Sequence, residues 1–367
     1  MKKLNRMAYY PGEKSEKRID HNTLKSLVTS IFKKCDMSHN HAKTVSESLI
    51  NADLRGIHSH GIIRVPEYVK KLREDGVNPK SNPVIISKFG GAIRVNGKNS
   101  MGQIGSKFSM MEAIKAANKN GISFVSLEGS NHCGTLDWYT LMASKKNLIG
   151  IAGTNALPTM APWGGKDKIV GLNPISISFP GIKNHDLVID TALGQTSHGK
   201  IRIYSQKNEK IPDGWAFNSN GLPTIDPNEA INGLIQPIGG FKGIGLAMMV
   251  GMLSTLLSNA QYGNNSGNMI DGAKPGADGQ FFIAININAF IDLETYESKI
   301  STIIKEFKAS SIADGFKQVY LPGEIENELM NKNLETGIPI NDKSIKDLKS
   351  IMEQLNLKPT LIATLIN

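Results

Sequence analysis

Apolar side chains near the start of the chain recur every three or four residues, which is the period of an amphipathic helix. Two helices are predicted, one from Leu24, Leu27, Val28, Ile31 and Phe32, the other from Ala42, Val45, Leu49 and Ala52. Ser38 stands where the second of these helices needs an N-cap. A third helix is predicted over residues 62–72, with Ile63, Val69 and Leu72 as its apolar positions.

Beyond Gly76 the pattern changes to short apolar runs that are typical of strands, with helical patterns between them. Strands are predicted at residues 84–87, 92–95, 122–127, 148–152, 175–179, 187–189 and 281–287. Helices are predicted at residues 104–114, 136–144, 296–307 and 345–355. This alternation indicates an α/β fold with a domain boundary near Gly76.

The longest apolar run, residues 244–257, is interrupted by polar and glycine residues and is too short to span a bilayer. We expect it to form a buried helix, and no membrane partner is predicted. Residues 1–17 are polar and contain Tyr9-Tyr10-Pro11-Gly12 instead of the apolar core of a secretion signal. The two cysteines, Cys35 and Cys133, lie far apart in the sequence, which suits a reducing compartment. These features predict a cytoplasmic protein.

Length and charge narrow the class of protein further. With 367 residues, of which 40% are hydrophobic and 20% charged, the chain is long enough for a large core and two domains. The formal net charge is +9, but the lysines that carry it are scattered along the chain instead of forming a basic block. The composition therefore argues against nucleic acid as a partner.

Polar side chains capable of chemistry gather around the glycines of residues 55–68. Arg55 and Arg64 flank Ser59-His60-Gly61, and planar guanidinium groups suit bidentate recognition of a carboxylate. His60, Arg64 and Tyr68 are spaced four residues apart, which places them on one face at the start of a helix. The segment predicts a site for a small anionic molecule, and an ordinary capped helix is the alternative.

A second acid/base candidate, His132, lies in Ser130-Asn131-His132-Cys133-Gly134, after a predicted strand and before a predicted helix. Its neighbour Cys133 is expected to pack in the interior. Another loop after a strand begins Gly153-Thr154-Asn155-Ala156 and exposes enough backbone to hold a flat ring. Asp190-Thr191-Ala192 closes a further strand, where Asp190 either accepts hydrogen bonds from ribose hydroxyls or caps a helix.

Gly239-Gly240-Phe241-Lys242 immediately precedes the apolar helix. Free backbone N–H groups, the positive end of the helix dipole and the lysine suit a phosphate, while close packing is the alternative role for the glycines. The spacing matches neither the P-loop nor the dinucleotide fingerprint, which argues against a classical Rossmann fold.

Two His-x-His pairs raise the alternative of a metal-dependent hydrolase. They are His39 with His41 and His58 with His60, and neither has an obvious third ligand. Because catalytic zinc takes three protein ligands, no metal is predicted. A catalytically inactive binding or scaffold protein is the other alternative, and the presence of both His60 and His132 argues against it.

The order of these motifs resembles the malate/L-lactate dehydrogenase family of non-Rossmann oxidoreductases, which includes ureidoglycolate dehydrogenase, sulfolactate dehydrogenase and diketogulonate reductase. The resemblance covers residues 24–340. Besides the motifs named above, it rests on Ala52-Asp53-Leu54-Arg55-Gly56, Ala161-Pro162-Trp163-Gly164-Gly165, Gly171-Leu172-Asn173-Pro174-Ile175, Pro223-Thr224-Ile225-Asp226-Pro227 and Pro322-Gly323-Glu324.

The resemblance implies an α/β (α+β) non-Rossmann fold. It places a mixed-sheet NAD(P)-binding domain at residues 77–290 and a mainly helical domain at residues 18–76 and 291–367. It also implies a homodimer that binds NAD, or NADP, and transfers hydride to or from a small 2-hydroxy or 2-keto acid. Malate with oxaloacetate is the first choice of substrate, and ureidoglycolate and L-lactate are the alternatives.

Residue roles also follow from the resemblance. His60 would exchange the substrate proton, with His132 as the alternative, while Arg64 would hold the carboxylate and Ser59 and Tyr68 would orient the substrate. The residues that the resemblance places along the cofactor are Asn155, Ala156, Asp190, Thr191, Ala192, Lys242, Pro322, Gly323 and Glu324.

Overall fold

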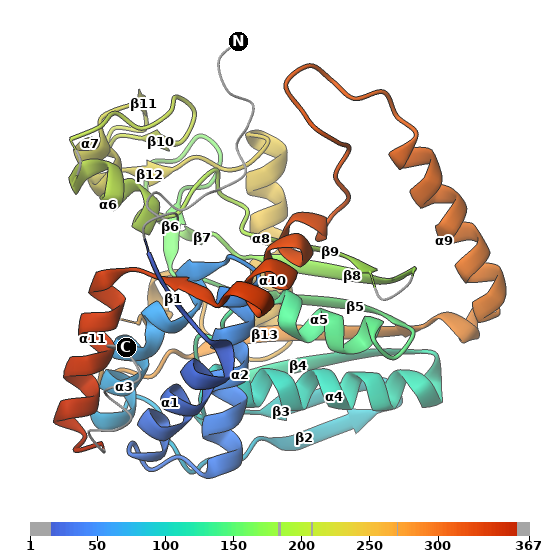
Figure 1. The fold of residues 1–367 in the computed structure, drawn as a ribbon, viewed down its shortest axis with the longest axis horizontal. Helices are drawn as coiled ribbons and strands as arrows, with labels where there is room; N and C mark the ends of the chain where they lie inside the picture. The colour runs from blue at the N-terminus through green and yellow to red at the C-terminus, as the bar shows by residue number, and fades with distance from the viewer. Residues whose placement is uncertain (1–15, 183–184, 207, 270, 358–367) are drawn as a thin grey trace.

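The computed structural model of the chain describes residues 16–182, 185–206, 208–269 and 271–357. The segment Tyr9-Tyr10-Pro11-Gly12 and residues 358–367 of the predicted C-terminal segment lie outside the described residues. A seven-stranded sheet occupies the centre of the molecule, and a helical layer made from both ends of the chain lies beside it (Figure 1).

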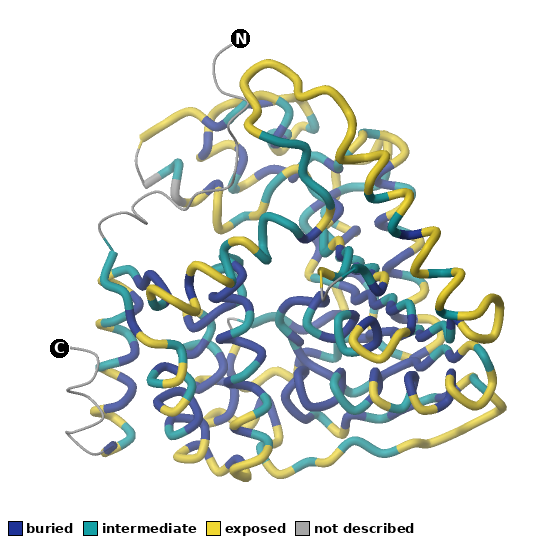
Figure 2. Tube along the Cα trace, turned by 45° about the vertical axis from the view of Figure 1, so that its right-hand side comes forward, coloured by how far each residue is buried: buried dark blue, intermediate teal, exposed yellow. Residues whose placement is uncertain are grey.

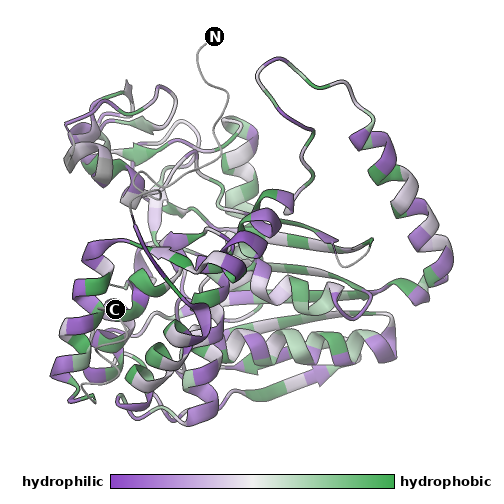
Figure 3. Cartoon of the chain, in the orientation of Figure 1, coloured by the Kyte–Doolittle hydropathy of each residue, from purple (hydrophilic) through white to green (hydrophobic). Residues whose placement is uncertain are grey.

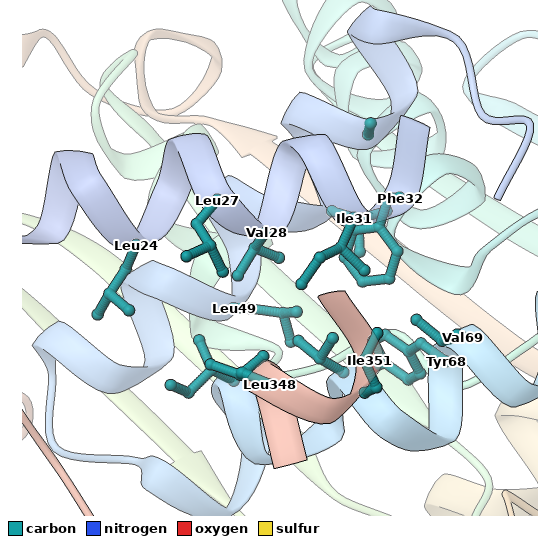
Figure 4. Close-up of a cluster of buried hydrophobic side chains, with 14 of the residues drawn as sticks. Leu24, Leu27, Val28, Ile31, Phe32, Leu49, Tyr68, Val69, Leu348 and Ile351 are labelled. Atoms are coloured by element: carbon teal, nitrogen blue, oxygen red, sulfur yellow. The ribbon is translucent and has the colours of Figure 1, made fainter. Parts of the chain in front are cut away.

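The helical layer joins the first and last parts of the chain. Its helices are α1 (His21–Lys33), α2 (His39–Leu54), α3 (Val65–Arg73), α10 (Glu324–Thr336) and α11 (Asp342–Gln354). β1 (Lys17–Ile19) pairs antiparallel with β14 (Ile338–Ile340), which ties the two ends together. The predicted helical periodicity is confirmed, because Leu24, Leu27 and Leu49 lie in one buried cluster with Leu348 and Ile351 of α11 (Figure 4).

Capping fixes where these helices begin. The side chain of Ser38 accepts a hydrogen bond from the backbone N–H of His41 at 3.2 Å, which confirms Ser38 as the N-cap of α2. Asp20 does the same for α1 through the N–H of Thr23 at 2.8 Å.

The central sheet is mixed. Its strands lie in the order β2 (Val84–Phe89), β3 (Ala92–Asn96), β4 (Ile122–Ser130), β13 (Asp278–Asn286), β5 (Leu148–Thr154), β8 (Ile175–Ile182) and β9 (His185–Thr191). β3 and β4 are parallel, and the other neighbouring pairs are antiparallel. The α/β, non-Rossmann fold with a mixed sheet is therefore confirmed.

Side chains alternate between the two faces of the sheet, and each face has its own core. Phe282 points to the face covered by α4 (Gly102–Asn120) and α5 (Asp137–Ser144). Its neighbour Phe281 points to the opposite face, where α8 (Phe241–Leu256) packs. The two loops that follow β4 and β5 carry His132 and Asn155.

The structure corrects the expectation that the apolar run at residues 244–257 forms a buried helix, because only one side of that helix is buried. α8 packs on the sheet through Ile244, Ala247 and Val250, whereas its opposite side is exposed. The exposed apolar side chains on that side include Leu246, Met249, Leu253 and Leu256. A helix lying on one face of a sheet buries only one side, so an apolar run alone does not establish complete burial. Among the described residues, no helix combines the length and apolarity needed to cross a membrane.

Smaller elements complete the fold: β6 (Pro158–Met160), β7 (Val170–Gly171), β10 (Ala216–Phe217), β11 (Pro223–Thr224), β12 (Leu234–Ile235), α6 (His198–Gln206), α7 (Pro227–Asn232), η3 (Gly263–Asn265) and η4 (Ile287–Ala289). α9 (Leu293–Lys308) contacts β8 and η4 and projects from the body of the molecule (Figure 1). Most of α9 and the loop after it are exposed (Figure 2), and hydrophobic and hydrophilic residues alternate along the helix (Figure 3).

Candidate active site

The segment after α2 is shaped by one buried carboxylate. Asp53, near the end of α2, accepts a hydrogen bond from the backbone N–H of Ile62 at 2.8 Å, and its other oxygen lies 2.8 Å from His58 Nδ1. A Cβ added to Gly61 would lie 2.1 Å from the Asp53 carboxyl group, so glycine is required at this close approach. The chain therefore forms two short 3-10 turns, η1 (His58–His60) and η2 (Ile62–Arg64), and α3 begins at Val65. The helix predicted from residue 62 thus starts three residues later.

Two histidines that are distant in the sequence face each other in the structure. The rings of His60, in η1, and His132, in the loop after β4, stack with their centroids 5.4 Å apart at an interplanar angle of 21°. Ser59 Oγ lies 2.9 Å from His60 Nδ1, and Tyr68 Oη lies 2.7 Å from His132 Nδ1. The structure thus brings together four residues predicted to act on the substrate.

Tyr68 reaches this cluster from the helical core. Its ring lies among the buried side chains of α1 and α3 (Figure 4), with its centroid 6.4 Å from that of Phe32. Burial raises the pKa of the Tyr68 phenol above its usual value, so the hydroxyl remains protonated. A rigid ring therefore delivers a neutral hydroxyl to His132.

Both histidines are neutral at pH 7. Burial and the nearby charge of Arg64 lower the pKa of His60 to about 4. Burial lowers the pKa of His132 well below its usual value, and the nearby His60 and Arg64 lower it further. An unprotonated imidazole either accepts a proton at one ring nitrogen or donates a hydrogen bond from the other, which is the property that acid/base chemistry needs.

Arg64 is oriented by its own turn. Its Nε donates to the backbone oxygen of Ser59 at 2.7 Å, and its Nη1 donates to Glu67 Oε2 at 2.7 Å. The side chain is 29% exposed. Among the described residues these bonds engage Nε and Nη1, and Nη2 is the guanidinium nitrogen with no bond to a neighbour, a geometry that suits an anion.

Arg55 lies in the interior, which contradicts the expectation that both arginines recognise an anion. Arg55 is 3% exposed. Its Nε donates to Asp137 Oδ2 at 2.6 Å and its Nη1 to Asn327 Oδ1 at 2.7 Å. The side chain is buried and joins α2 to α5 and α10 through these two partners.

Asp190 is not the N-cap residue of a helix, but from the end of β9 it binds the start of α5. Its Oδ2 accepts hydrogen bonds from the backbone N–H groups of Leu136 and Asp137, at 2.7 and 2.9 Å, at the start of α5. Burial and the neighbouring Asp137 raise the pKa of Asp190 to about 7. Thr191 is half-buried and Ala192 is exposed at the end of the same strand.

The segment Pro322-Gly323-Glu324 lies against β9. The oxygen of Pro322 accepts a hydrogen bond from the N–H of Val188 at 3.1 Å. Gly323 has a φ of 85°, and a Cβ there would lie 2.6 Å from Val188 Cγ1. Glu324 binds Lys308 Nζ at 2.6 Å and accepts the N–H of Leu321 at 2.8 Å. Two of the segments predicted to line a cofactor are thus brought together.

A third predicted segment, Asn155 and Ala156, is held by internal bonds. Asn155 accepts the N–H of Gly279 at 2.8 Å and donates to the oxygen of Gln261 at 3.0 Å. The N–H of Ala156 donates to Asn173 Oδ1 at 2.9 Å. These hydrogen bonds tie the Asn155 side chain and the Ala156 N–H to neighbouring loops. A ligand at this segment would therefore contact the groups of the loop that these bonds do not use.

Lys242 is exposed in the first turn of α8. Gly239 and Gly240 both have a φ of 60°, a backbone conformation that favours glycine. A Cβ on Gly239 would meet nothing within 4 Å. The first turn of a helix offers backbone N–H groups, and here it also carries Lys242 on an open surface. These are the donors that the phosphates of a dinucleotide require, so this end of α8 fits such a group.

Sequence reasoning missed two buried residues that hold the site together, Asp53 and Gln103. Gln103 Nε2 donates to Tyr68 Oη at 2.9 Å. Asp53 gave a usable signal, because a carboxylate adjoining the apolar stripe of an amphipathic helix needs a partner. Gln103 gave none, because its partner is 35 residues away in the sequence. Among the described residues, no three His, Cys, Asp or Glu side chains gather in a way that could hold a metal ion.

Comparison with known proteins gives a consistent result. A family model described as malate/L-lactate dehydrogenase matches residues 19–349. The chain is 35% identical over 336 residues to a malate/(S)-sulfolactate dehydrogenase of Methanothermus fervidus, covering 92% of this chain and 97% of that protein. It is 36% identical over 349 residues to a malate dehydrogenase of Pyrococcus abyssi, covering 93% and 96%. The solved structure of a sulfolactate dehydrogenase from Methanocaldococcus jannaschii superposes with a TM-score of 0.89 at 35% identity, covering 93% of this chain and 98% of that one.

Proposed function

Because the chain belongs to the malate/L-lactate dehydrogenase family, we propose that it transfers hydride between NAD and a small 2-hydroxy or 2-keto acid. Malate with oxaloacetate is the proposed substrate pair. The observation that carries this proposal is the stacked pair of neutral histidines with Arg64 beside them, since it combines acid/base chemistry with an anion-binding group.

Each residue of the cluster has a proposed part. Arg64 binds the substrate carboxylate through Nη2, which places the 2-hydroxyl or 2-keto oxygen between the histidines. His60 accepts the hydroxyl proton during oxidation and returns a proton during reduction. Ser59 and Tyr68 orient the rings of His60 and His132 through their hydrogen bonds.

The proposed cofactor residues lie on four segments. Lys242 and the start of α8 would hold the phosphates, while residues 155–156, 190–192 and 322–324 would contact the rest of the dinucleotide. Bound nicotinamide supplies the hydride in one direction and accepts it in the other. We propose NAD as the first choice and NADP as the alternative.

Ureidoglycolate and L-lactate are the alternative substrates. Sulfolactate is a further alternative, because relatives are named sulfolactate dehydrogenases. All four are 2-hydroxy acids whose carboxylate suits Arg64, so the cluster does not choose between them. We further propose a cytoplasmic location, in keeping with Cys35 and Cys133, which are free and buried thiols.

A cofactor-oxidation assay tests the function. We expect the purified protein to oxidise NADH, followed at 340 nm as an absorbance loss, when oxaloacetate is added. Pyruvate, sulfopyruvate and oxalurate form the comparison panel, and NADPH replaces NADH in a parallel series. The proposal would be contradicted if no acid led to oxidation and if neither NADH nor NADPH shifted the thermal midpoint of the protein. Activity lost to a chelator would instead favour a metal-dependent hydrolase.

We also propose that two copies of the chain associate through α8. Its outward side presents four apolar side chains that are 42–73% exposed, Leu246, Met249, Leu253 and Leu256, and exposed apolar residues gathered on one helix side are typical of a protein–protein interface.

Sedimentation velocity tests this dimer. The wild type is expected to sediment as a dimer, and Met249→Glu combined with Leu253→Glu is expected to sediment as a monomer, because two charges would be buried unpaired. Leu222→Glu, at an exposed leucine away from α8, is the matched control and should leave the dimer intact. A wild type that sediments as a monomer at micromolar concentration would contradict the proposal.

A further inference from the structure

Gln103 lies under the loop that carries His132. It belongs to the first turn of α4 and its side chain is completely buried. The preceding residue, Gly102, packs so closely on the loop that an added Cβ would lie 2.1 Å from the oxygen of Asn131 and 2.4 Å from that of His132. The start of α4 is therefore packed directly against the backbone of the loop that carries His132.

The amide begins a directed chain of hydrogen bonds. Gln103 Nε2 donates to Tyr68 Oη at 2.9 Å, and Tyr68 Oη lies 2.7 Å from His132 Nδ1. An amide nitrogen carries two hydrogens and accepts none, so the Tyr68 oxygen is the acceptor in the first bond. The single hydroxyl hydrogen of Tyr68 is then donated to His132 Nδ1. A neutral imidazole that accepts at Nδ1 carries its hydrogen on Nε2.

His60 has a different kind of partner. Ser59 Oγ lies 2.9 Å from His60 Nδ1, and nothing fixes the direction of that bond, since a serine hydroxyl both donates and accepts. His60 Nδ1 can donate to Ser59 while Nε2 takes up or releases a proton. If His132 carried its hydrogen on Nδ1, the Tyr68 oxygen would have to accept hydrogen bonds from both Gln103 and His132. The hydroxyl hydrogen of Tyr68 would then have no acceptor in this chain of bonds. The two stacked histidines are therefore not equivalent.

We propose that Gln103 is a positioning residue which, through Tyr68, fixes His132 as the neutral tautomer with its hydrogen on Nε2. His132 then donates a hydrogen bond to the substrate oxygen, and His60 alone exchanges the proton. The inference rests on the proposed function and divides the work between its two histidines. When the hydroxy acid is oxidised, the hydrogen on carbon leaves as hydride to bound nicotinamide and the hydroxyl proton passes to His60.

Nitrogen NMR of protein labelled with 15N in histidine tests the tautomer directly. The signals of His132 are assigned by their absence from His132→Ala. In the free wild-type enzyme we expect a protonated Nε2 and an unprotonated Nδ1, unchanged between pH 6 and 8. A wild-type spectrum with the hydrogen on Nδ1 would overturn the proposal, and it can be read whether or not any keto acid is a substrate. The cofactor-oxidation assay reports separately on the proposed function.

The variant Gln103→Met tests the part played by the amide. Methionine fills a similar volume and removes the donor, so the Tyr68 hydroxyl becomes free to turn. We expect a mixture of His132 tautomers and a kcat about tenfold lower, with KM for the keto acid changed less than twofold, as for the loss of one hydrogen bond.

Ser109→Ala is the matched control, because Ser109 is equally buried on the same helix and has no part in the Tyr68 chain. It should keep the wild-type tautomer and kcat. A folded Gln103→Met enzyme with an unchanged His132 tautomer would contradict the role of Gln103. If that variant does not fold, the wild-type spectrum still decides the tautomer, and Tyr68→Phe breaks the same chain one bond later.

Discussion

Replacing His60 with alanine should lower kcat for oxaloacetate reduction by about 10²- to 10⁴-fold, the usual contribution of general acid/base catalysis. His60 is neutral at pH 7, since its pKa is lowered to about 4, so it can accept the proton of a hydroxy acid. Alanine removes the imidazole that is proposed to exchange the proton, whose partner Ser59 can act as either hydrogen-bond donor or acceptor. Steady-state kinetics at pH 7 measure the loss.

His132→Ala gives the comparison. If His132 only donates a hydrogen bond to the substrate oxygen, its loss should lower kcat by about 10- to 100-fold, the cost of one hydrogen bond, which is less than the loss of His60. His39→Ala, at an exposed histidine on α2, should have wild-type kinetics and serves as the control. A deeper loss in His132→Ala than in His60→Ala, with NADH binding retained in both, would reassign proton transfer to His132.

Replacing Arg55 with methionine should lower the free energy of unfolding by about 3–5 kcal/mol, the usual cost of leaving a buried charge without its partner. Asp137 would lose the guanidinium group 2.6 Å away and would remain beside a second buried carboxyl, Asp190. Asn327 would lose a hydrogen bond as well. Urea denaturation measures the change.

Arg94→Met is the matched control. Arg94 forms a similar ion pair with Glu128 at 2.7 Å, but its side chain is 39% exposed, so its loss should cost only about 0–1 kcal/mol. Adding Asp137→Asn to Arg55→Met should restore part of the loss, because the unpaired charge disappears. If the two arginine variants lose equal stability, the Arg55–Asp137 pair is not the buried bond that its geometry indicates.

Local periodicity predicted most helices and strands, because the pattern of apolar residues is itself local. It did not predict strand order: the mixed sheet was implied by family resemblance, and β13 lies between β4 and β5 although it comes last of the seven sheet strands in the sequence. The same limit applied to α8. Its apolar run predicted a helix, but whether both sides are covered depends on elements elsewhere in the chain.

The candidate site shows a similar division. His60 and His132 each stood out beside glycines in predicted loops, yet their stacking depends on the 3-10 turn that Asp53 imposes and on the position of the loop after β4. Arg55 was misread because its partner, Asp137, is 82 residues away and becomes a neighbour only in the folded protein. The sequence therefore identified the chemical groups better than it identified their partners.

The insertion of β13 between β4 and β5 also bears on how the enzyme forms. About 150 residues of chain separate β4 from β13, and the register places Asp278 opposite Ser130, two residues before His132. During synthesis the edges of β4 and β5 that pair with β13 stay unpaired until β13 has been made. Pairing between strands so far apart in the sequence slows folding and exposes the chain to aggregation. The loop of His132 receives its final support only then, so catalytic competence is among the last properties that the growing chain acquires.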